Sequence, residues 1–129
     1  MCEVDAALYV IDCNPNTNEE LIYDRTIDLV QMLKKQRPDV PVLLVEGFLN
    51  ESNYFNPASG VNKTVEQKQK ELKRAYETLK KSGVTQLFYQ KGDELIGKDH
   101  EATVDSIHPN DVGMMRIAEI MLPAIKKIL

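Results

Sequence analysis

The sequence is poor in the residues that build disulfide scaffolds and metal sites. Among 129 residues it has two cysteines, two histidines and no tryptophan. Cys2 and Cys13 are too few for a disulfide framework or a zinc site. No apolar run approaches the length of a membrane-spanning helix, which is about 20 residues. Residues 1–5 also lack the basic start and apolar core of a signal peptide. Localisation is therefore unknown, since this chain is compatible with a secreted, periplasmic or cytoplasmic parent.

Positive charge is also in short supply. The net charge is -4, with 16 Lys and Arg against 20 Asp and Glu. This balance gives no reason to expect a nucleic acid or an anionic membrane as partner. The length suits one domain with a real core, so residues 1–129 are expected to form a single domain.

Apolar patterning alternates between short runs and helical spacing. Three short runs are expected to be strands: Ala6–Ile11, Pro41–Glu46 and Val84–Gln90. Three longer stretches are expected to be helices: Thr17–Gln36, Asn62–Ser82 and Asn110–Leu129. The first strand has no polar alternation, which predicts burial on both faces. The alternation predicts a parallel sheet flanked by helices. Three strands are few for such a sheet, so the sheet is expected to be incomplete.

Helix boundaries and loops carry their own signals. Asn16 or Thr17 is expected to cap the first helix, and Gly83 to cap the second at its C-terminus. Pro123 should kink the last helix or end one segment of it. Gly47–Val61 is long for a connection and holds several aromatic residues. It is expected to be either a functional lid or a surface loop whose aromatics pack onto the domain.

One stretch carries a chemical pattern, Asp105-Ser106-Ile107-His108-Pro109. On a single turn, Asp105 can accept a hydrogen bond from one ring nitrogen of His108. That contact fixes the tautomer and leaves the other nitrogen free as a general base. The competing interpretation is a solvated turn before a helix, because Asn and Asp are good N-caps and Pro blocks a helix upstream of it.

The stretch resembles the last sequence block of the SGNH/GDSL hydrolases, Asp-x-x-His before a C-terminal helix. The loop Asp12-Cys13-Asn14-Pro15-Asn16 is similar to the third block of that family, in which an Asn follows a strand. Either Asn14 or Asn16 matches this Asn. The family's Gly-Asp-Ser block, which carries the nucleophile, has no counterpart in this chain. Gly92-Asp93 is followed by Glu94 and comes after the wrong strand.

The resemblance implies a three-layer α/β/α, flavodoxin-like domain, of which this chain supplies the C-terminal part. It implies a serine esterase or acylhydrolase acting on acyl or acetyl esters, including esters of carbohydrates, without cofactor or metal. His108 would be the base and Asp105 its orienting partner. Asn16 or Asn14 would donate to the oxyanion. The chain itself has no nucleophile, since its four serines (Ser52, Ser59, Ser82 and Ser106) are all poorly placed, so it is expected to be inactive alone.

A missing neighbour would also leave an exposed strand. In the family, the absent first strand lies beside the run Ala6–Ile11. An apolar strand edge without a partner is a template for pairing with another chain. We therefore expect a homodimer through this edge.

Other functions fit parts of the sequence. A non-catalytic module that binds a ligand or protein on a flavodoxin-like scaffold is the main alternative, because fold does not fix function. A metal enzyme would use a different set of residues: His100, His108, Asp99 and Asp105. Two histidines with carboxylates of undefined geometry are a weak metal signal. Cys13 as a nucleophile is a fourth possibility, set against the usual role of cysteine as a small core residue.

Overall fold

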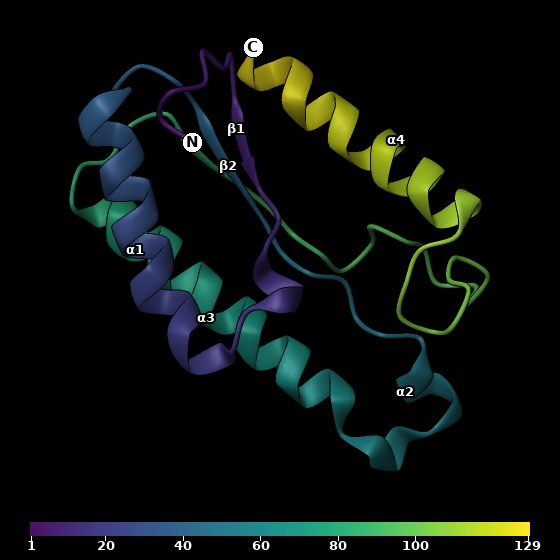
Figure 1. The fold of residues 1–129 in the computed structure, drawn as a ribbon. Helices are drawn as coiled ribbons and strands as arrows, with labels where there is room; N and C mark the ends of the chain where they lie inside the picture. The colour runs from purple at the N-terminus through teal and green to yellow at the C-terminus, as the bar shows by residue number, and fades with distance from the viewer.

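The computed structural model describes residues 1–129 as a three-stranded parallel sheet between two layers of helices. The strands β1 (Tyr9–Ile11), β2 (Val42–Val45) and β3 (Leu87–Gln90) pair in the order β1-β2-β3. The helices α1 (Glu19–Gln36) and α3 (Val61–Lys81) cover one face of the sheet, and α4 (Asp111–Ile128) covers the other (Figure 1). The predicted fold class, an incomplete α/β/α parallel sheet, is confirmed.

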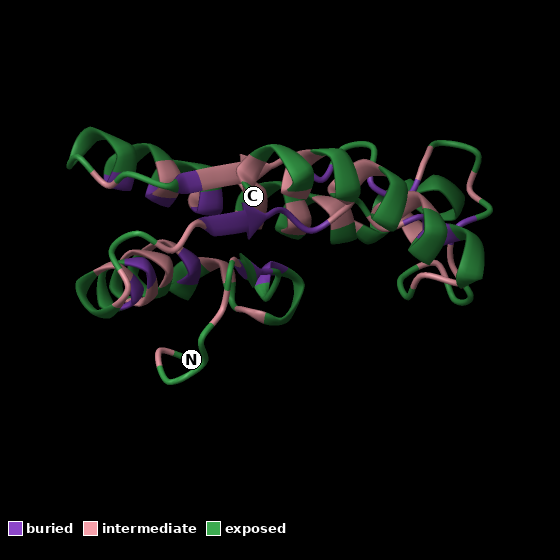
Figure 2. Ribbon diagram, turned by 90° about the horizontal axis from the view of Figure 1, so that it is seen from above, coloured by how far each residue is buried: buried purple, intermediate pink, exposed green.

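The core is centred on β2. All four residues of this strand are buried, because it is paired on both sides and covered on both faces (Figure 2). Val42 and Leu44 pack with residues of α1 and α3, while Leu43 and Val45 pack on the opposite face with residues of α4. Burial of each such side chain contributes about 1.5–3 kcal/mol.

The strands are shorter than expected from the apolar runs. The ladder of β1 begins at Tyr9, whose N–H donates to the carbonyl of Pro41 at 3.0 Å. Before that point the chain folds back, and the Tyr9 hydroxyl donates to the carbonyl of Val4 at 2.9 Å. Residues 6–8 therefore lie outside the strand.

The structure corrects the predicted N-cap of the first helix. The N-cap of α1 is Asn18, whose side chain accepts from the N–H of Glu20 at 3.0 Å. The prediction of Asn16 or Thr17 was wrong, because residues 14–16 form a 3-10 turn of their own. At the end of α3 the cap is Ser82, and Gly83 follows it with a φ of 90°. The N–H groups of Gly83 and Val84 then bond back to carbonyls of the last turn, as in a Schellman motif.

The structure decides between two expectations for Pro123. The helix α4 runs unbroken through this residue, so no segment ends there. The connection after β2 contains the short helix α2 (Ser52–Phe55) and a 3-10 turn, Pro57–Ser59. None of the helices is both long and apolar enough to cross a membrane.

The sheet is covered unevenly at its β1 edge. Val10 is 41% exposed, which contradicts the prediction that this strand is buried on both faces. The reason is that Tyr9 and Ile11 face the core on the α1 and α3 side, so Val10 faces the opposite side, where it is not among the residues that pack with α4. The helix α4 also keeps apolar side chains in solvent: Met114, Met115 and Leu122.

This open edge generates a prediction about self-association. The unpaired groups of β1 and the exposed Val10 should let two copies pair edge to edge, so sedimentation velocity should show a concentration-dependent dimer. Val10→Lys should shift the chain to monomer, because a charged side chain on an edge strand opposes pairing. The control is Val4→Lys, which adds the same charge at an exposed valine outside the strand. Wild type that stays monomeric at high concentration would contradict the prediction.

Candidate active site

A small hairpin at residues 102–110 presents His108. Its two sides are joined by the N–H of Val104, which donates to the carbonyl of His108 at 2.9 Å, and by an antiparallel bridge between Thr103 and Pro109. The hairpin runs directly into α4, where the Asn110 side chain caps the helix by accepting from Gly113 N–H at 3.0 Å. A Cβ at Gly113 would meet the Ala102 carbonyl at 2.2 Å, so only glycine allows this close approach.

The tip of the hairpin pairs Asp105 with His108. Oδ1 of Asp105 accepts from the backbone N–H of His108 at 2.7 Å and from that of Ile107 at 3.0 Å. Its Oδ2 lies 2.6 Å from Nδ1 of the His108 ring. We assign the proton to Nδ1, because an ionised carboxylate only accepts. Nε2 then keeps its lone pair. The hydrogen bond predicted from the three-residue spacing is therefore present.

These contacts favour the charged form of Asp105. The backbone N–H of His108, the His108 ring and the N–H of Ile107 together lower the pKa of this carboxyl from 3.8 to about 2. Both side chains are open to solvent, with 73% of His108 and 49% of Asp105 exposed. Charge interactions and hydrogen bonds between exposed side chains contribute little to stability because water screens them and competes for them. Asp105 and His108 are therefore hydrogen-bonded to each other, but both side chains face solvent.

None of the four serines hydrogen-bonds to the His108 ring. Ser106 adjoins Asp105 and has a φ of 72°, while the Ser82 hydroxyl donates to the Leu79 carbonyl at 2.8 Å. The hydroxyl oxygen of Ser52 is buried without a partner. Ser59 accepts from the N–H of Val61 at 3.5 Å. The structure thus gives His108 no serine partner within this chain.

The two candidate asparagines lie on the 3-10 turn Asn14–Asn16, directly after β1. Asn14 is 4% exposed, and both polar atoms of its amide lack a hydrogen-bond partner. Asn16 is exposed. Lys68 of α3 holds the turn between them, since its Nζ donates to the Pro15 carbonyl at 2.8 Å. The two side chains therefore differ in whether a substrate could reach them.

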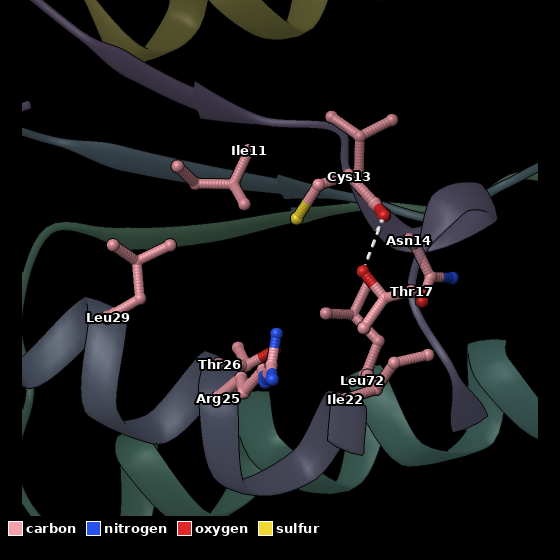
Figure 3. A pocket seen from close by; sticks show the side chains of 10 residues that line it. Ile11, Cys13, Asn14, Thr17, Ile22, Arg25, Thr26, Leu29 and Leu72 are labelled. Atoms are coloured by element: carbon pink, nitrogen blue, oxygen red, sulfur yellow. Dashed lines mark hydrogen bonds between the residues drawn. The ribbon is translucent and has the colours of Figure 1, made fainter. Parts of the chain in front are cut away.

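A pocket of about 210 Å³ opens beside this turn, between β1 and α1. Figure 3 shows that the sulfur of Cys13 points into it, with Ile11, Leu29 and Leu72 among the apolar lining. Cys13 is exposed rather than a core residue, and no hydrogen bond joins it to His108. The lining comes from the end of β1, the turn after it, α1, β2 and α3.

The residues of the metal hypothesis are not brought together. Asp99 forms a two-point ion pair with Arg116 of α4, with both N···O distances at 2.6 Å. His100 stacks on Tyr54 with ring centroids 3.9 Å apart. The structure contains no group of three His, Cys, Asp or Glu side chains that could hold a metal ion.

The connection after β2 lies against the hairpin. Tyr54 and Phe55 are 64% and 69% exposed, so these two aromatics do not pack into the domain. Sequence reasoning missed two buried carboxylates in this region, Glu46 and Glu51, each 6% exposed. Glu46 accepts from the Tyr89 hydroxyl and from Gly92 N–H. The position of Glu46 directly after a buried strand could have identified it from the sequence, whereas no local sequence pattern identifies Glu51.

A sequence model of the GDSL-like lipase/acylhydrolase family matches residues 1–126. The chain belongs to this family. No curated protein sequence matches it.

Two solved structures resemble the chain. One is a provisionally assigned GDSL-like lipase from Bacteroides ovatus ATCC 8483, with 35% sequence identity and a TM-score of 0.91 over 98% of this chain. The other is the salicylyl-acyltransferase SsfX3 from a tetracycline biosynthetic pathway, with 18% identity and a TM-score of 0.75, which supports the fold alone. This chain spans 37% and 39% of the lengths of these two proteins.

The depressed pKa of Asp105 predicts a local pH dependence. Its folded pKa of about 2 lies below the ordinary 3.8, so its contribution to stability is present above about pH 4 and is lost as the pH falls through 2. In Asp105→Asn, the side chain can still accept the backbone N–H groups but carries no charge. The difference in unfolding free energy between wild type and variant should therefore shrink from pH 5 to pH 2 in urea titrations. A constant difference over this range would contradict the assignment.

Proposed function

We propose that this chain is the C-terminal part of a serine ester hydrolase, with Asp105 and His108 as its orienting acid and general base. One observation carries the proposal: Nδ1 of His108 lies 2.6 Å from the Asp105 carboxylate on an exposed turn, which leaves Nε2 free to take a proton. Membership of the GDSL-like lipase/acylhydrolase family supports ester or acyl chemistry.

In the proposed reaction, Nε2 of His108 takes the hydroxyl proton of a serine as the serine oxygen attacks the ester carbonyl. The carbonyl electrons move to oxygen and form an oxyanion. Collapse expels the alcohol, which receives the proton from Nε2, and leaves an acyl-serine. Water then attacks the acyl-serine by the same route. Throughout, Asp105 keeps the ring oriented and stabilises its charged form, which the low pKa of its carboxyl favours.

Asn16 is the better candidate for the oxyanion donor. A donor must reach the oxygen that develops charge, and Asn16 is exposed whereas Asn14 is 4% exposed. Such a donor typically lowers the barrier by about 3–4 kcal/mol, because a positioned N–H stabilises the oxyanion. Asn14 is buried, and its amide has no hydrogen-bond partner within the chain.

The nucleophile in this proposal lies outside the chain. The two solved relatives are more than twice as long as this chain, so a further segment is available in proteins of this fold. A cover from such a segment would also lower the effective dielectric around His108, where electrostatic effects become stronger. The chain by itself is therefore proposed to be inactive.

The proposed substrates are acyl or acetyl esters, including those of carbohydrates. Apolar side chains flank the base, with Val104 73% and Ile107 45% exposed, and they suit the hydrocarbon part of an acyl group. The stacked pair of Tyr54 and His100 offers a flat surface of the kind that sugar rings pack against. Capture of the acyl group by an alcohol instead of water would turn the same chemistry into acyl transfer.

The first test is hydrolysis of p-nitrophenyl acetate by this chain and by His108→Ala. Neither should show turnover above the buffer rate. Addition of an upstream segment with a Gly-Asp-Ser block should bring turnover, and His108→Ala in that longer chain should lower kcat by about 10⁴-fold or more. A longer chain that binds esters without hydrolysing them would favour the non-catalytic binding module instead.

The second test separates the two asparagines in the longer, active chain. Asn16→Ala should lower kcat by about 10²–10³-fold with little change in KM, because it removes a donor used only in the transition state. Asn14→Ala is the matched control, two residues away on the same turn, and should leave kcat within a few fold. The reverse pattern would transfer the oxyanion role to Asn14.

A further inference from the structure

The buried residue Glu51 connects the segment after β2 to both parts of the His108 hairpin. Its carboxylate accepts a hydrogen bond from the Thr103 hydroxyl, on one side of the hairpin. Its backbone N–H donates to the carbonyl of Ser106 at 3.0 Å, at the hairpin tip. The side chain of Glu51 is 6% exposed, so it makes these contacts away from bulk water. Each is therefore worth more than an equivalent surface contact.

The hairpin tip needs support from outside. Ser106 has a φ of 72°, in the left-handed region that non-glycine residues rarely adopt. Such a conformation is unfavourable by itself and persists where surrounding contacts hold it. Ser106 stands between Asp105 and His108, so any relaxation of its backbone would change the geometry of that pair. The N–H groups of Glu51 and Ser52, at 3.0 and 3.4 Å, are the backbone donors that its carbonyl accepts from.

The segment that carries Glu51 is itself fixed at several points. Asn62 of α3 exchanges two hydrogen bonds with the backbone of Asn50, at 2.8 and 3.2 Å. Tyr54 stacks on His100, which precedes the hairpin. The segment that carries Glu51 is therefore fixed to α3, and the contacts of Glu51 fix the hairpin to that segment.

We infer that Glu51 is a positioning residue for His108, acting through Thr103 and the backbone of Ser106. This inference rests on the proposed function, because it assumes that the orientation of the His108 ring matters for proton transfer. The contacts that join Glu51 to the hairpin lie within this chain and do not depend on that assumption. Loss of the carboxylate would leave the Thr103 hydroxyl without its partner and would loosen the hairpin against α2.

The pKa of Asp105 distinguishes positioning from a simple effect of charge. Removal of the negative charge of Glu51 would by itself favour ionised Asp105 and lower its pKa further. Loosening of the turn would instead weaken the hydrogen bonds from His108 and Ile107, and would raise the pKa from about 2 toward 3.8. The two explanations therefore predict shifts of opposite sign.

The test follows the Asp105 carboxyl carbon by NMR during acid titration of the 129-residue chain. In Glu51→Ala, the pKa of Asp105 should rise toward 3.8. Glu51→Gln should not raise the pKa of Asp105 above the wild-type value, because an amide oxygen can still accept from Thr103. Thr103→Val should reproduce the effect of Glu51→Ala, and Thr103→Ser should restore the wild-type value. No change, or a lower pKa, in both Glu51→Ala and Thr103→Val would overturn the inference.

Amide hydrogen exchange at neutral pH gives a second measurement that does not require acid. Protection of the His108 N–H should fall about tenfold in Glu51→Ala and Thr103→Val, the scale of one lost hydrogen bond. Protection of the β2 amides in the core should fall less. The control is Glu94→Ala, which removes an exposed carboxylate paired with Lys98 and should change neither region. Equal loss in the hairpin and in β2 would mean general destabilisation and would overturn the inference.

These measurements are independent of catalysis. A raised Asp105 pKa with no esterase activity in any longer chain would leave the support of the hairpin intact and remove the proposed function. Esterase activity that depends on His108 but is unchanged by Glu51→Ala, together with an unchanged Asp105 pKa, would leave the function and remove the role of Glu51.

Discussion

A short antiparallel bridge between Thr103 and Pro109 determines where His108 lies. It closes a hairpin whose tip brings the His108 ring within 2.6 Å of Asp105 and whose end continues into α4. The hairpin has no core of its own, so it depends on anchors from both sides. Asn110 and Gly113 fix it to α4, and Glu51 fixes it to the segment after β2. The site is thus a surface turn with a rigid support.

The sheet is fully covered at its central strand and open at the outer edge of β1. β2 is buried completely, whereas β1 leaves Val10 exposed and has no outer partner. The pocket beside Cys13 and the turn that carries Asn14 and Asn16 both adjoin the C-terminal end of β1. Asp105 and His108 are hydrogen-bonded to each other but face solvent. A further strand beside β1 would complete the sheet, and the proposed function also requires a segment that brings a serine to His108.

Features set by residues close together in the sequence could be predicted, whereas features set by contacts between distant residues could not. The Asp105–His108 contact was predictable because a single turn sets it, and the alternation of elements was sufficient for the fold class. The exposure of Val10 was not, because it depends on how far α4 covers that face of β1. Asn14 and Asn16 could not be separated, since contacts with α3 determine which of them is buried. Glu51 meets a residue 52 positions later in the chain, and no local pattern marks such a pair.

The central claim is that this chain supplies the base and its partner to a serine that lies outside it. A fluorophosphonate probe, which labels activated serines, tests this most directly when labelled peptides are identified by mass spectrometry. We predict no labelling of the 129-residue chain. In a longer chain we predict labelling of one upstream serine, which is lost in His108→Ala. Labelling of Ser52, Ser59, Ser82 or Ser106 in the chain alone, dependent on His108, would contradict it.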